Sequence, residues 1–283
     1  MAVALAGAGR EIVAVDAMQV YRGMDIGTAK PTTADQSEVR HHGIDLVAAD
    51  TDFTVADYQR ATTAALNDIA RRGATALLVA GTGLYLTSII DGLTLPGEWP
   101  HIRAELESEA NDPNALYARL ARLDPAAAAR IEPGNTRRLV RALEVCLGSG
   151  RPFSSFGPGT GAYPQIDTVQ IGLRWPRAQL AGRVERRVHT MVAAGLVDEV
   201  TRLASTPGGM SRTARQALGY KEVIAHLDGE CSLDAAIADI IVRTRQFAVR
   251  QERWFRRDPR IRWIDITDDP VATVAPVVEE HLA

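Results

Sequence analysis

Two short apolar runs constrain the fold of this chain more than any other feature of its sequence. Residues 11–16 (EIVAVD) and 74–80 (ATALLVA) are rich in β-branched and aliphatic side chains, which is typical of strands buried on both faces of a parallel sheet. Asp16 ends the first run, and Gly81-Thr82-Gly83 follows the second and opens a helical segment. In open α/β sheets, ligands bind beyond the carboxyl ends of the strands. We therefore expect Asp16 and Thr82 to face a ligand.

The rest of the chain alternates between strand and helix patterns, with one long helical interruption. We predict strands over 43–47, 168–175 and 261–266, and helices after Thr54, Pro176 and Ser232, the last of these reaching about Arg257. Four helical segments without strands lie at 100–111, 113–123, 125–131 and 136–148. The pattern predicts an α/β core formed by residues 1–94 and 158–283 and an inserted all-helical subdomain at 95–157.

The first residues have the composition of a helix end. Met1–Ala6 (MAVALA) followed by Gly7 resembles the last turns of a helix and its terminating glycine. We therefore expect the chain to begin inside an element, with a strand and a loop missing upstream.

Composition excludes several classes of protein. With 46% hydrophobic and 24% charged residues, the chain is neither disordered nor fibrous. Its two cysteines, Cys146 and Cys231, have no CxxC spacing and form no disulfide framework, which favours a reducing, cytoplasmic location. We see no signal segment and no apolar run of about 20 residues, so we expect no membrane association.

Basic residues are unevenly distributed although the net charge is −3. Between Arg243 and Arg262 eight arginines accompany only two carboxylates. Arg243, Arg250 and Arg253 share one stripe of the predicted long helix, while Phe247 and Trp254 lie elsewhere around it. Such a stripe can bind a nucleic-acid backbone or can simply be solvated, and a GC-rich genome alone would favour arginine.

Three residues could carry chemistry, each with a simpler interpretation beside it. Asp16 could face a ligand beyond the end of its strand or be a carboxylate that caps the next loop. Thr82 could donate to an anion or merely occupy a tight turn. Arg215 could bind a phosphate through two hydrogen bonds or form a surface salt bridge. The six histidines have no metal-ligand spacing, so we assign no metal ligands and interpret His41 and His42 as a loop or strand start.

Five segments together resemble one known family. They are 15–31 (VDAMQVYRGMDIGTAKP), 41–46 (HHGIDL), 77–86 (LLVAGTGLYL), 135–145 (NTRRLVRALEV) and 217–222 (ALGYKE). In this order they are similar to the tRNA dimethylallyltransferases, the isopentenyl-tRNA transferase family, over essentially the whole chain.

The resemblance implies a nucleotide-binding (ATP-binding) type of core, a P-loop NTPase-like parallel sheet, with a helical insertion that contacts tRNA. It implies transfer of a dimethylallyl group from dimethylallyl diphosphate to N6 of adenosine 37, next to the anticodon, with Mg²⁺ as cofactor. Asp16 matches the general base, and Thr82 and Arg215 match catalytic positions that bind the diphosphate. The family's contacts to the anticodon stem-loop, together with the arginine stripe, suggest these tRNA-binding residues: Asp16, Ala17, Met18, Gln19, Thr82, Arg103, Arg137, Arg138, Leu139, Val140, Arg141, Arg243, Arg250 and Arg253.

Two departures from the family pattern bear on activity. Ala17 replaces a serine that usually follows the aspartate, and no GxxxxGK[ST] phosphate loop occurs in the sequence. Either the start codon is assigned too late, or the protein is a shortened, catalytically impaired tRNA-binding protein. A third alternative is prenylation of free adenine nucleotides, which needs no RNA surface. We expect a monomer.

Overall fold

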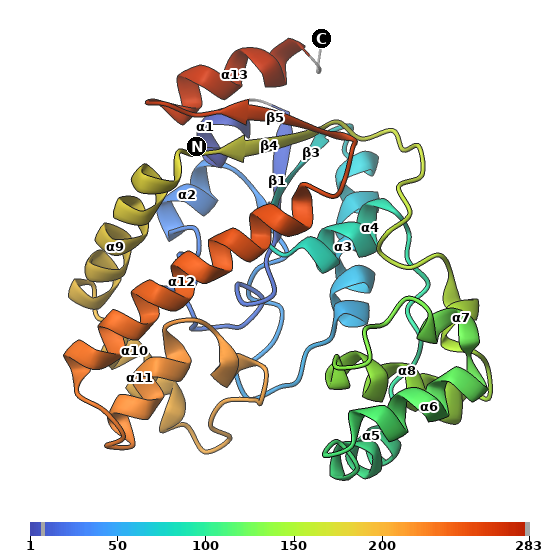
Figure 1. Cartoon of the computed structure of the whole chain (residues 1–283). Coiled ribbons are helices and arrows are strands. Elements are labelled where there is room, and N and C mark those ends of the chain that lie inside the picture. Colours follow the sequence, from blue (N-terminus) through green and yellow to red (C-terminus); the bar gives the residue numbers. More distant parts are fainter. Residues whose placement is uncertain (7–8, 281–283) are drawn as a thin grey trace. The chain divides into compact units, whose positions relative to one another are not determined.

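The chain forms two compact units in a computed structural model that describes residues 1–6 and 9–280. The first unit comprises residues 1–90 and 165–283, and the second comprises residues 91–164, which include the predicted insertion. Figure 1 shows the elements of both units along the chain. The predicted terminator Gly7 lies outside the described residues, but a short helix, α1 (Ala2–Ala6), does precede the first strand.

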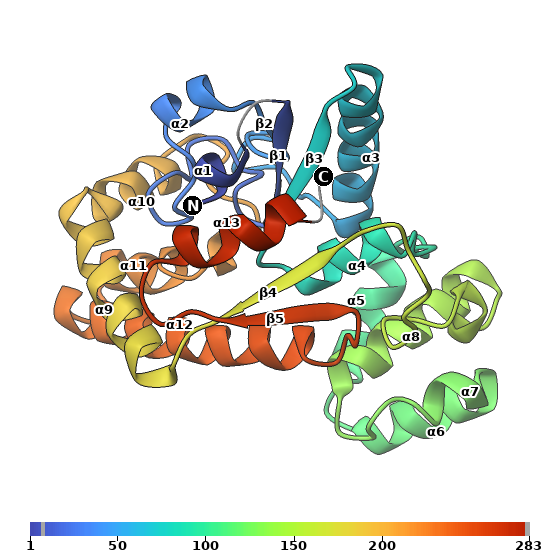
Figure 2. The ribbon, with the colours of Figure 1, turned by 90° about the horizontal axis from the view of Figure 1, so that it is seen from above.

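The strands of the first unit are parallel and, among the described residues, form two separate groups. The first sheet has the order β2-β1-β3 and contains β1 (Arg10–Val15), β2 (His41–His42) and β3 (Thr75–Ala80). The second pairs β4 (Gln170–Arg174) with β5 (Ile261–Asp265), and Figure 2 shows these two strands side by side. The sequence predicts the strands at 168–175 and 261–266 correctly within a few residues.

The strand predicted at 43–47 is wrong. The structure places β2 at His41–His42 instead, and Val47 makes only an isolated bridge to Tyr21. Gly43 has φ +78° and Asp45 has φ +53°, so the backbone cannot continue as an extended strand. At Gly43 a Cβ atom would lie 2.6 Å from the Ala14 carbonyl oxygen, so this close approach to β1 requires glycine.

Helices of the first unit begin largely where the sequence signals them. Thr54 caps α3 through a capping box with Asp57, and Ser232 caps α12 by accepting a hydrogen bond from Ala235 N. Besides α1, the described helical elements of this unit are α2 (Thr33–Glu38), α3 (Val55–Arg71), α4 (Gly83–Ile90), α9 (Arg177–Ala193), α10 (Leu196–Ala204), η2 (Ala214–Gln216), α11 (Tyr220–Leu227), α12 (Leu233–Phe255) and α13 (Pro270–Glu280).

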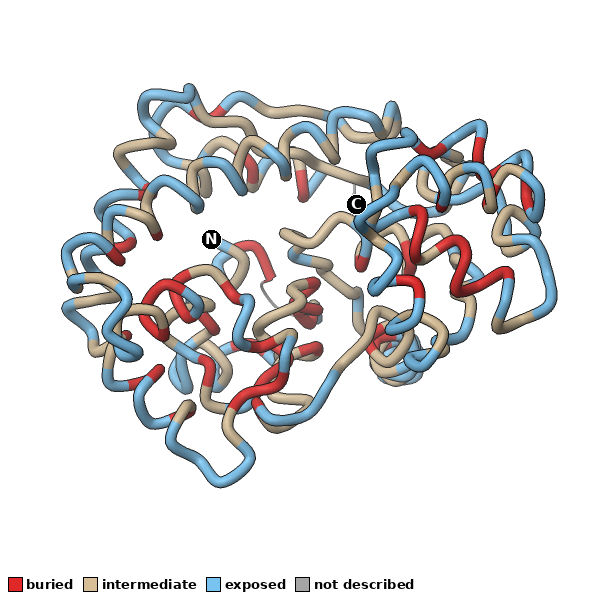
Figure 3. The backbone as a smooth tube through the Cα atoms, turned by 60° about the horizontal axis from the view of Figure 1, so that its bottom comes forward, coloured by how far each residue is buried: buried red, intermediate tan, exposed pale blue. Residues whose placement is uncertain are grey.

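The core of the first unit surrounds the carboxyl half of β1. Val13 and Val15 are fully buried there with Tyr58 of α3 and Val188 of α9. In contrast, β3 is only partly buried and Val79 is 40% exposed, so the prediction that this strand is buried on both faces is wrong. Figure 3 marks the buried residues in red.

The second unit is helical throughout its described elements and has a core of its own. Its elements are α5 (Pro100–Ser108), α6 (Pro113–Leu123), α7 (Pro125–Ala128), α8 (Thr136–Ser149) and η1 (Phe153–Phe156). This core contains two alanines of α7, Ala127 and Ala128, together with the buried leucines Leu106, Leu120, Leu139 and Leu143. Asp112 and Asn135 cap α6 and α8: their side-chain oxygens accept hydrogen bonds from Ala115 N and Arg138 N in the first turn of each helix.

Candidate active site

Asp16 lies directly after β1 and closes a tight turn. Its Oδ1 accepts hydrogen bonds from Met18 N at 2.7 Å and Gln19 N at 3.2 Å. The carboxylate therefore does cap the following loop, as the simpler interpretation predicts. Only Oδ1 is used in these bonds, so Oδ2 stays available to accept a proton.

Thr82 lies beside this turn because the loop after β3 bonds back to the end of β1. Gly81 N and Thr82 N both donate to the Val15 carbonyl, at 3.2 and 3.3 Å. The Thr82 Oγ1 in turn accepts a hydrogen bond from Ala17 N at 3.2 Å. A hydroxyl that accepts in this way keeps its own hydrogen free to donate. The structure thus brings together Asp16 and Thr82, two of the three residues that the sequence singles out for catalysis.

Helix α12 supports the Gly-Thr-Gly loop from a distant part of the sequence. Gln251 Nε2 donates to the Gly81 carbonyl at 2.7 Å. The Trp254 ring covers Gly83 so closely that a Cβ atom there would lie 2.1 Å from Cδ1 of the indole. The sequence analysis missed Gln251 and assigned Trp254 only to the apolar side of the helix, because nothing local relates them to a loop 170 residues away.

Two tyrosines pack against the end of β1, next to the site. Tyr58 donates from its hydroxyl to the Ala14 carbonyl at 2.5 Å, and its ring lies 4.7 Å from that of Tyr85. Burial raises the pKa of Tyr58 to about 12, and the Asp16 charge acts in the same direction. Burial also raises the pKa of Tyr85, so both rings stay neutral at physiological pH, and Tyr58 holds β1 through its hydrogen bond.

Arg187 of α9 is a further cation near Asp16. Its side chain is exposed to solvent, yet nearby protein lowers the pKa of the guanidinium by desolvation, and attraction to the Asp16 carboxylate opposes that shift. An arginine remains protonated under these conditions. The sequence analysis did not select Arg187, and its only sequence signal is a second arginine, Arg186, beside it on a helix that also carries the buried Val184 and Val188.

Arg215 is not joined to the other two predicted catalytic residues. It lies exposed in η2, and no hydrogen bond or ion pair among the described residues connects its side chain to Asp16 or Thr82. Its backbone N–H bonds to the Ser211 carbonyl at 3.0 Å. Its predicted role therefore rests on the family resemblance alone.

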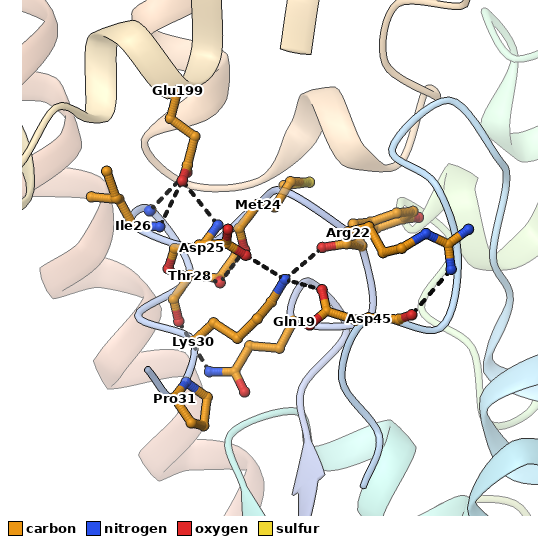
Figure 4. A network of polar contacts seen from close by, with 12 residues as sticks. Gln19, Arg22, Met24, Asp25, Ile26, Thr28, Lys30, Pro31, Asp45 and Glu199 are labelled. Atoms are coloured by element: carbon orange, nitrogen blue, oxygen red, sulfur yellow. Dashed lines mark hydrogen bonds and ion pairs between the residues drawn. The ribbon is translucent and has the colours of Figure 1, made fainter. Parts of the chain in front are cut away.

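The loop between Asp16 and Pro31 is fixed by a polar network, which Figure 4 shows from close by. Glu199 of α10 accepts hydrogen bonds from three consecutive backbone N–H groups, those of Asp25, Ile26 and Gly27, at 2.8–3.2 Å. The hydroxyl of Tyr220 donates to the same carboxylate at 2.5 Å, and burial together with this bond raises the pKa of Tyr220. The loop that carries Ala17, Met18 and Gln19 is thus anchored to α10 and α11.

The arginines of the long helix differ in how they are engaged. Arg243 bonds to Asp239 at 2.6 Å and lies 3.4 Å from Glu222, so its charge is already compensated. Arg250 stacks over Phe247, with 5.8 Å between guanidinium carbon and ring centroid, and Arg253 is exposed. Phe247 itself is 37% exposed, which makes it part of the outer surface.

The predicted RNA-contacting residues of the second unit also divide into two groups. Arg103 and Arg141 both face the fully buried Glu144, with N–O distances of 2.9 and 3.0 Å. Burial opposes ionisation of Glu144, but the Arg103 hydrogen bond and further donors keep its pKa lowered.

The stretch predicted to bind tRNA at the start of α8 has two exposed residues followed by two buried ones. Arg137 and Arg138 are exposed, whereas Leu139 and Val140 are 0% and 5% exposed and belong to the core. We therefore correct the prediction for Leu139 and Val140, whose side chains are not accessible to RNA.

The described residues contain neither a cluster of metal-binding side chains nor a membrane-spanning helix. No three His, Cys, Asp or Glu side chains in residues 1–6 and 9–280 gather closely enough to hold a metal ion. Within the same residues, no helix has the length and apolar character needed to cross a membrane.

A parallel α/β core with a carboxylate and a hydroxyl joined at the ends of two strands has the groups that a group-transfer enzyme uses, because the carboxylate can deprotonate an acceptor and the hydroxyl can donate to an anionic leaving group. The IPP transferase family model matches residues 19–258. The chain belongs to this family of transferases.

Individual relatives agree with the family match. The tRNA dimethylallyltransferase of Streptomyces coelicolor is 47% identical over 258 residues, which cover 90% of this chain and 82% of that protein. The tRNA dimethylallyltransferase of Acidothermus cellulolyticus is 48% identical over 269 residues, covering 94% of this chain and 84% of that protein. Among solved structures, the tRNA isopentenylpyrophosphate transferase of Bacillus halodurans is similar with a TM-score of 0.71 and 37% identity, covering 99% of this chain and 91% of that chain.

Proposed function

We propose that this chain transfers a dimethylallyl group from dimethylallyl diphosphate to N6 of adenosine 37 in tRNA. The observation that carries the mechanism is the turn after β1, where Asp16 and Thr82 are joined through Ala17 N. Family membership and the names of the relatives support the transfer of a dimethylallyl group to tRNA. Adenosine 37 as the acceptor rests on the resemblance of residues 15–31 to the family.

The reaction needs a base because an exocyclic amine is a weak nucleophile. N6 forms a bond to C1 of the allyl group while the bond between C1 and the diphosphate oxygen breaks, and the electron pair of that bond leaves with the diphosphate. The amine proton goes to the Asp16 carboxylate, whose Oδ2 is not used by the turn. Fixing Oδ1 with two backbone N–H groups keeps Oδ2 in one position, which favours a productive geometry.

The leaving diphosphate needs fixed donors and positive charge. The Thr82 hydroxyl can donate to it, because Thr82 Oγ1 already accepts from Ala17 N. We assign the positive charge to Arg215, as the family resemblance implies, and propose Arg187, whose pKa is influenced by the Asp16 charge, as a second cation. The family resemblance implies Mg²⁺ as cofactor; it would neutralise negative charge on the leaving diphosphate, and no step above depends on it.

Each unit has arginines that, among the described residues, have no carboxylate partner and that we assign to tRNA binding. On α12 these are Arg250 and Arg253, and on α8 they are the exposed Arg137 and Arg138. The phosphate backbone supplies most of the affinity in such contacts, whereas the base is bound after it leaves its stack. We give Arg243 a smaller share because two carboxylates already face it.

Substitution of Asp16 by Asn tests the mechanism. An amide keeps an oxygen to accept from Met18 N and Gln19 N but cannot take the proton, so kcat should fall by about 10²–10⁴-fold. Transfer of labelled dimethylallyl diphosphate to unmodified tRNA is the assay, with Asp268→Asn as the control on an exposed aspartate.

The acceptor is tested in the same assay. We expect transfer to tRNA with adenosine at position 37, and none to free AMP or to tRNA with guanosine there. A rate within a few-fold of wild type for Asp16→Asn would show that Asp16 is not the base. Salt-sensitive tRNA binding without any turnover would instead favour a tRNA-binding protein.

A further inference from the structure

The side chain of Lys30 is almost completely enclosed by the loop that follows the active-site turn. It is 3% exposed, and its ammonium group reaches the Tyr21 carbonyl at 2.7 Å, Asp25 Oδ1 at 2.7 Å and Asp45 Oδ1 at 2.6 Å. An ammonium group has three hydrogens to donate, and here each has an acceptor. Figure 4 shows Lys30 at the centre of these contacts.

The three acceptors come from two segments of the chain. Tyr21 and Asp25 belong to the loop itself, whereas Asp45 lies in the segment after β2 and has a left-handed backbone with φ +53°. Asp45 N donates to the Gln19 carbonyl at 3.1 Å. One residue therefore links the ammonium group of Lys30 to the backbone of Gln19.

Gln19 connects this network to the active-site carboxylate. Its backbone N–H donates to Asp16 Oδ1, and its side-chain Nε2 donates to the carbonyls of Thr28 and Ala29, at 3.1 and 3.3 Å. Thr28 and Ala29 immediately precede Lys30 in the sequence. Contacts on both sides of Gln19 thus converge on Lys30, and the position of the Asp16 turn depends on the loop remaining closed around it.

We propose that Lys30 is a positioning residue for the general base, an inference that rests on the proposed role of Asp16. Without the ammonium group, the carboxylates of Asp25 and Asp45 would face each other with no cation between them and would repel. The loop would open at Asp45, and Gln19 would no longer hold Asp16 Oδ1. Glu199 would still anchor the backbone of residues 25–27, so the opening is confined to the side of the loop near Asp16.

The first test compares Lys30→Met with Lys221→Met, which removes the other lysine of the chain, an exposed one. A displacement of the base by ~1 Å costs about 10²-fold in rate, so we expect kcat of Lys30→Met to fall by about that factor while KM for dimethylallyl diphosphate changes less than ~3-fold. Lys221→Met should behave as wild type. An effect confined to KM, or no effect on kcat in a folded Lys30→Met variant, overturns the proposal.

Charge repair separates positioning from a general loss of structure. The double variant Lys30→Met with Asp45→Asn removes one of the two facing carboxylates and should recover part of the lost kcat, by about 3–10-fold. If Lys30→Met does not fold, Asp45→Asn alone takes its place: it keeps the ammonium group and two acceptors and should lower kcat by ~3–10-fold. No recovery in the first case, or wild-type kcat in the second, contradicts the proposal.

Amide hydrogen exchange provides a measurement that does not depend on transferase activity. By NMR of the full chain without substrates, Lys30→Met, or Asp45→Asn in its place, should speed exchange at Met18 and Gln19, whose N–H groups bond to Asp16, by at least ~10-fold. Exchange in α3 should stay unchanged. If the wild-type protein shows no transferase activity but the variant exchanges faster at Met18 and Gln19, the proposed function fails and the control of the turn by Lys30 stands. If exchange at these two residues is unchanged in the variant, the positioning role of Lys30 is wrong whatever the activity.

Discussion

Substitution of Gly83 by alanine should damage the active site through a single added methyl group. The new Cβ atom would lie 2.1–2.6 Å from three atoms of the Trp254 ring, whereas ordinary contact begins near 3.4 Å. Helix α4 or the indole must therefore move by about 1 Å. Because Thr82 is the residue directly before Gly83, this movement displaces the hydroxyl that we assign to the diphosphate.

The expected magnitude has a stability part and a catalytic part. Overpacking costs about 1–3 kcal/mol, and the better helix propensity of alanine offsets at most about 1 kcal/mol of it. For a unit of this size each kcal/mol lowers Tm by about 2–4 °C, so we expect a loss of a few degrees. A displacement of about 1 Å at a group in contact with the leaving diphosphate should lower kcat by about 10²-fold.

Thermal unfolding and single-turnover transfer measure the two parts separately. Gly182→Ala is the matched control, since it lies inside α9 with only the flexible end of Arg186 at 3.4 Å, and it should stabilise the protein by about 0.5–1 kcal/mol. Adding Trp254→Leu to Gly83→Ala should restore part of kcat. Wild-type Tm and kcat in Gly83→Ala would refute the packing argument, and a lower Tm with wild-type kcat would refute the role of Thr82.

Three further predictions concern other parts of the protein. Hydrogen bonds from Arg72 and His42 lower the pKa of Glu11 from 4.5 to about 2. The contribution of the ionised Glu11 to stability is therefore complete above pH 4.5 and is lost as the pH falls toward 2. Tm should fall less steeply with acid in Glu11→Gln than in wild type. Arg253→Ala should reduce the slope of log affinity for tRNA against log salt by about 1, and Arg243→Ala by less, because carboxylates already compensate Arg243; equal slopes in both variants would contradict this assignment. Acetylation followed by mass spectrometry should modify Lys221 and spare the enclosed Lys30, unless the loop around Lys30 opens readily.

The features that the sequence predicted well depend on signals within a few residues of one another. Thr54 and Ser232 each cap the helix that follows them, and Pro113 begins α6 at the expected residue. The placement of Asp16 and Thr82 at strand ends also follows from local pattern, because a buried apolar run fixes where a strand stops. These parts of the fold and of the site required no knowledge of what packs against them.

The features that the sequence did not predict depend on distant neighbours. The bend at Gly43 is set by the close approach of Ala14 and Tyr58, neither of which is nearby in the chain. The partial exposure of Val79 and Phe247 depends on which elements pack against β3 and α12. The spacing of apolar residues along the sequence does not contain that information. The wrong strand at 43–47 and the missed accessibility of these side chains have this common cause.

The same reasoning explains which site residues were missed. Gln251 and Trp254 lie more than a hundred residues after Asp16, and only the packing of α12 brings them to the loop after β3. Lys30 stands within a segment that resembles the family, but its burial and its three acceptors become evident only when Asp45 folds back onto the loop.

The hydrogen bond between Gln251 and Gly81 has a consequence for synthesis on the ribosome. The loop after β3 leaves the ribosome long before α12 is made, since 170 residues separate the two partners. At elongation rates of about 5–20 residues per second, the loop waits roughly 10–30 s for its support. A nascent chain that stops short of α12 therefore carries the Gly81-Thr82-Gly83 loop without the contacts from Gln251 and Trp254, so the support of this loop is completed only near the end of translation.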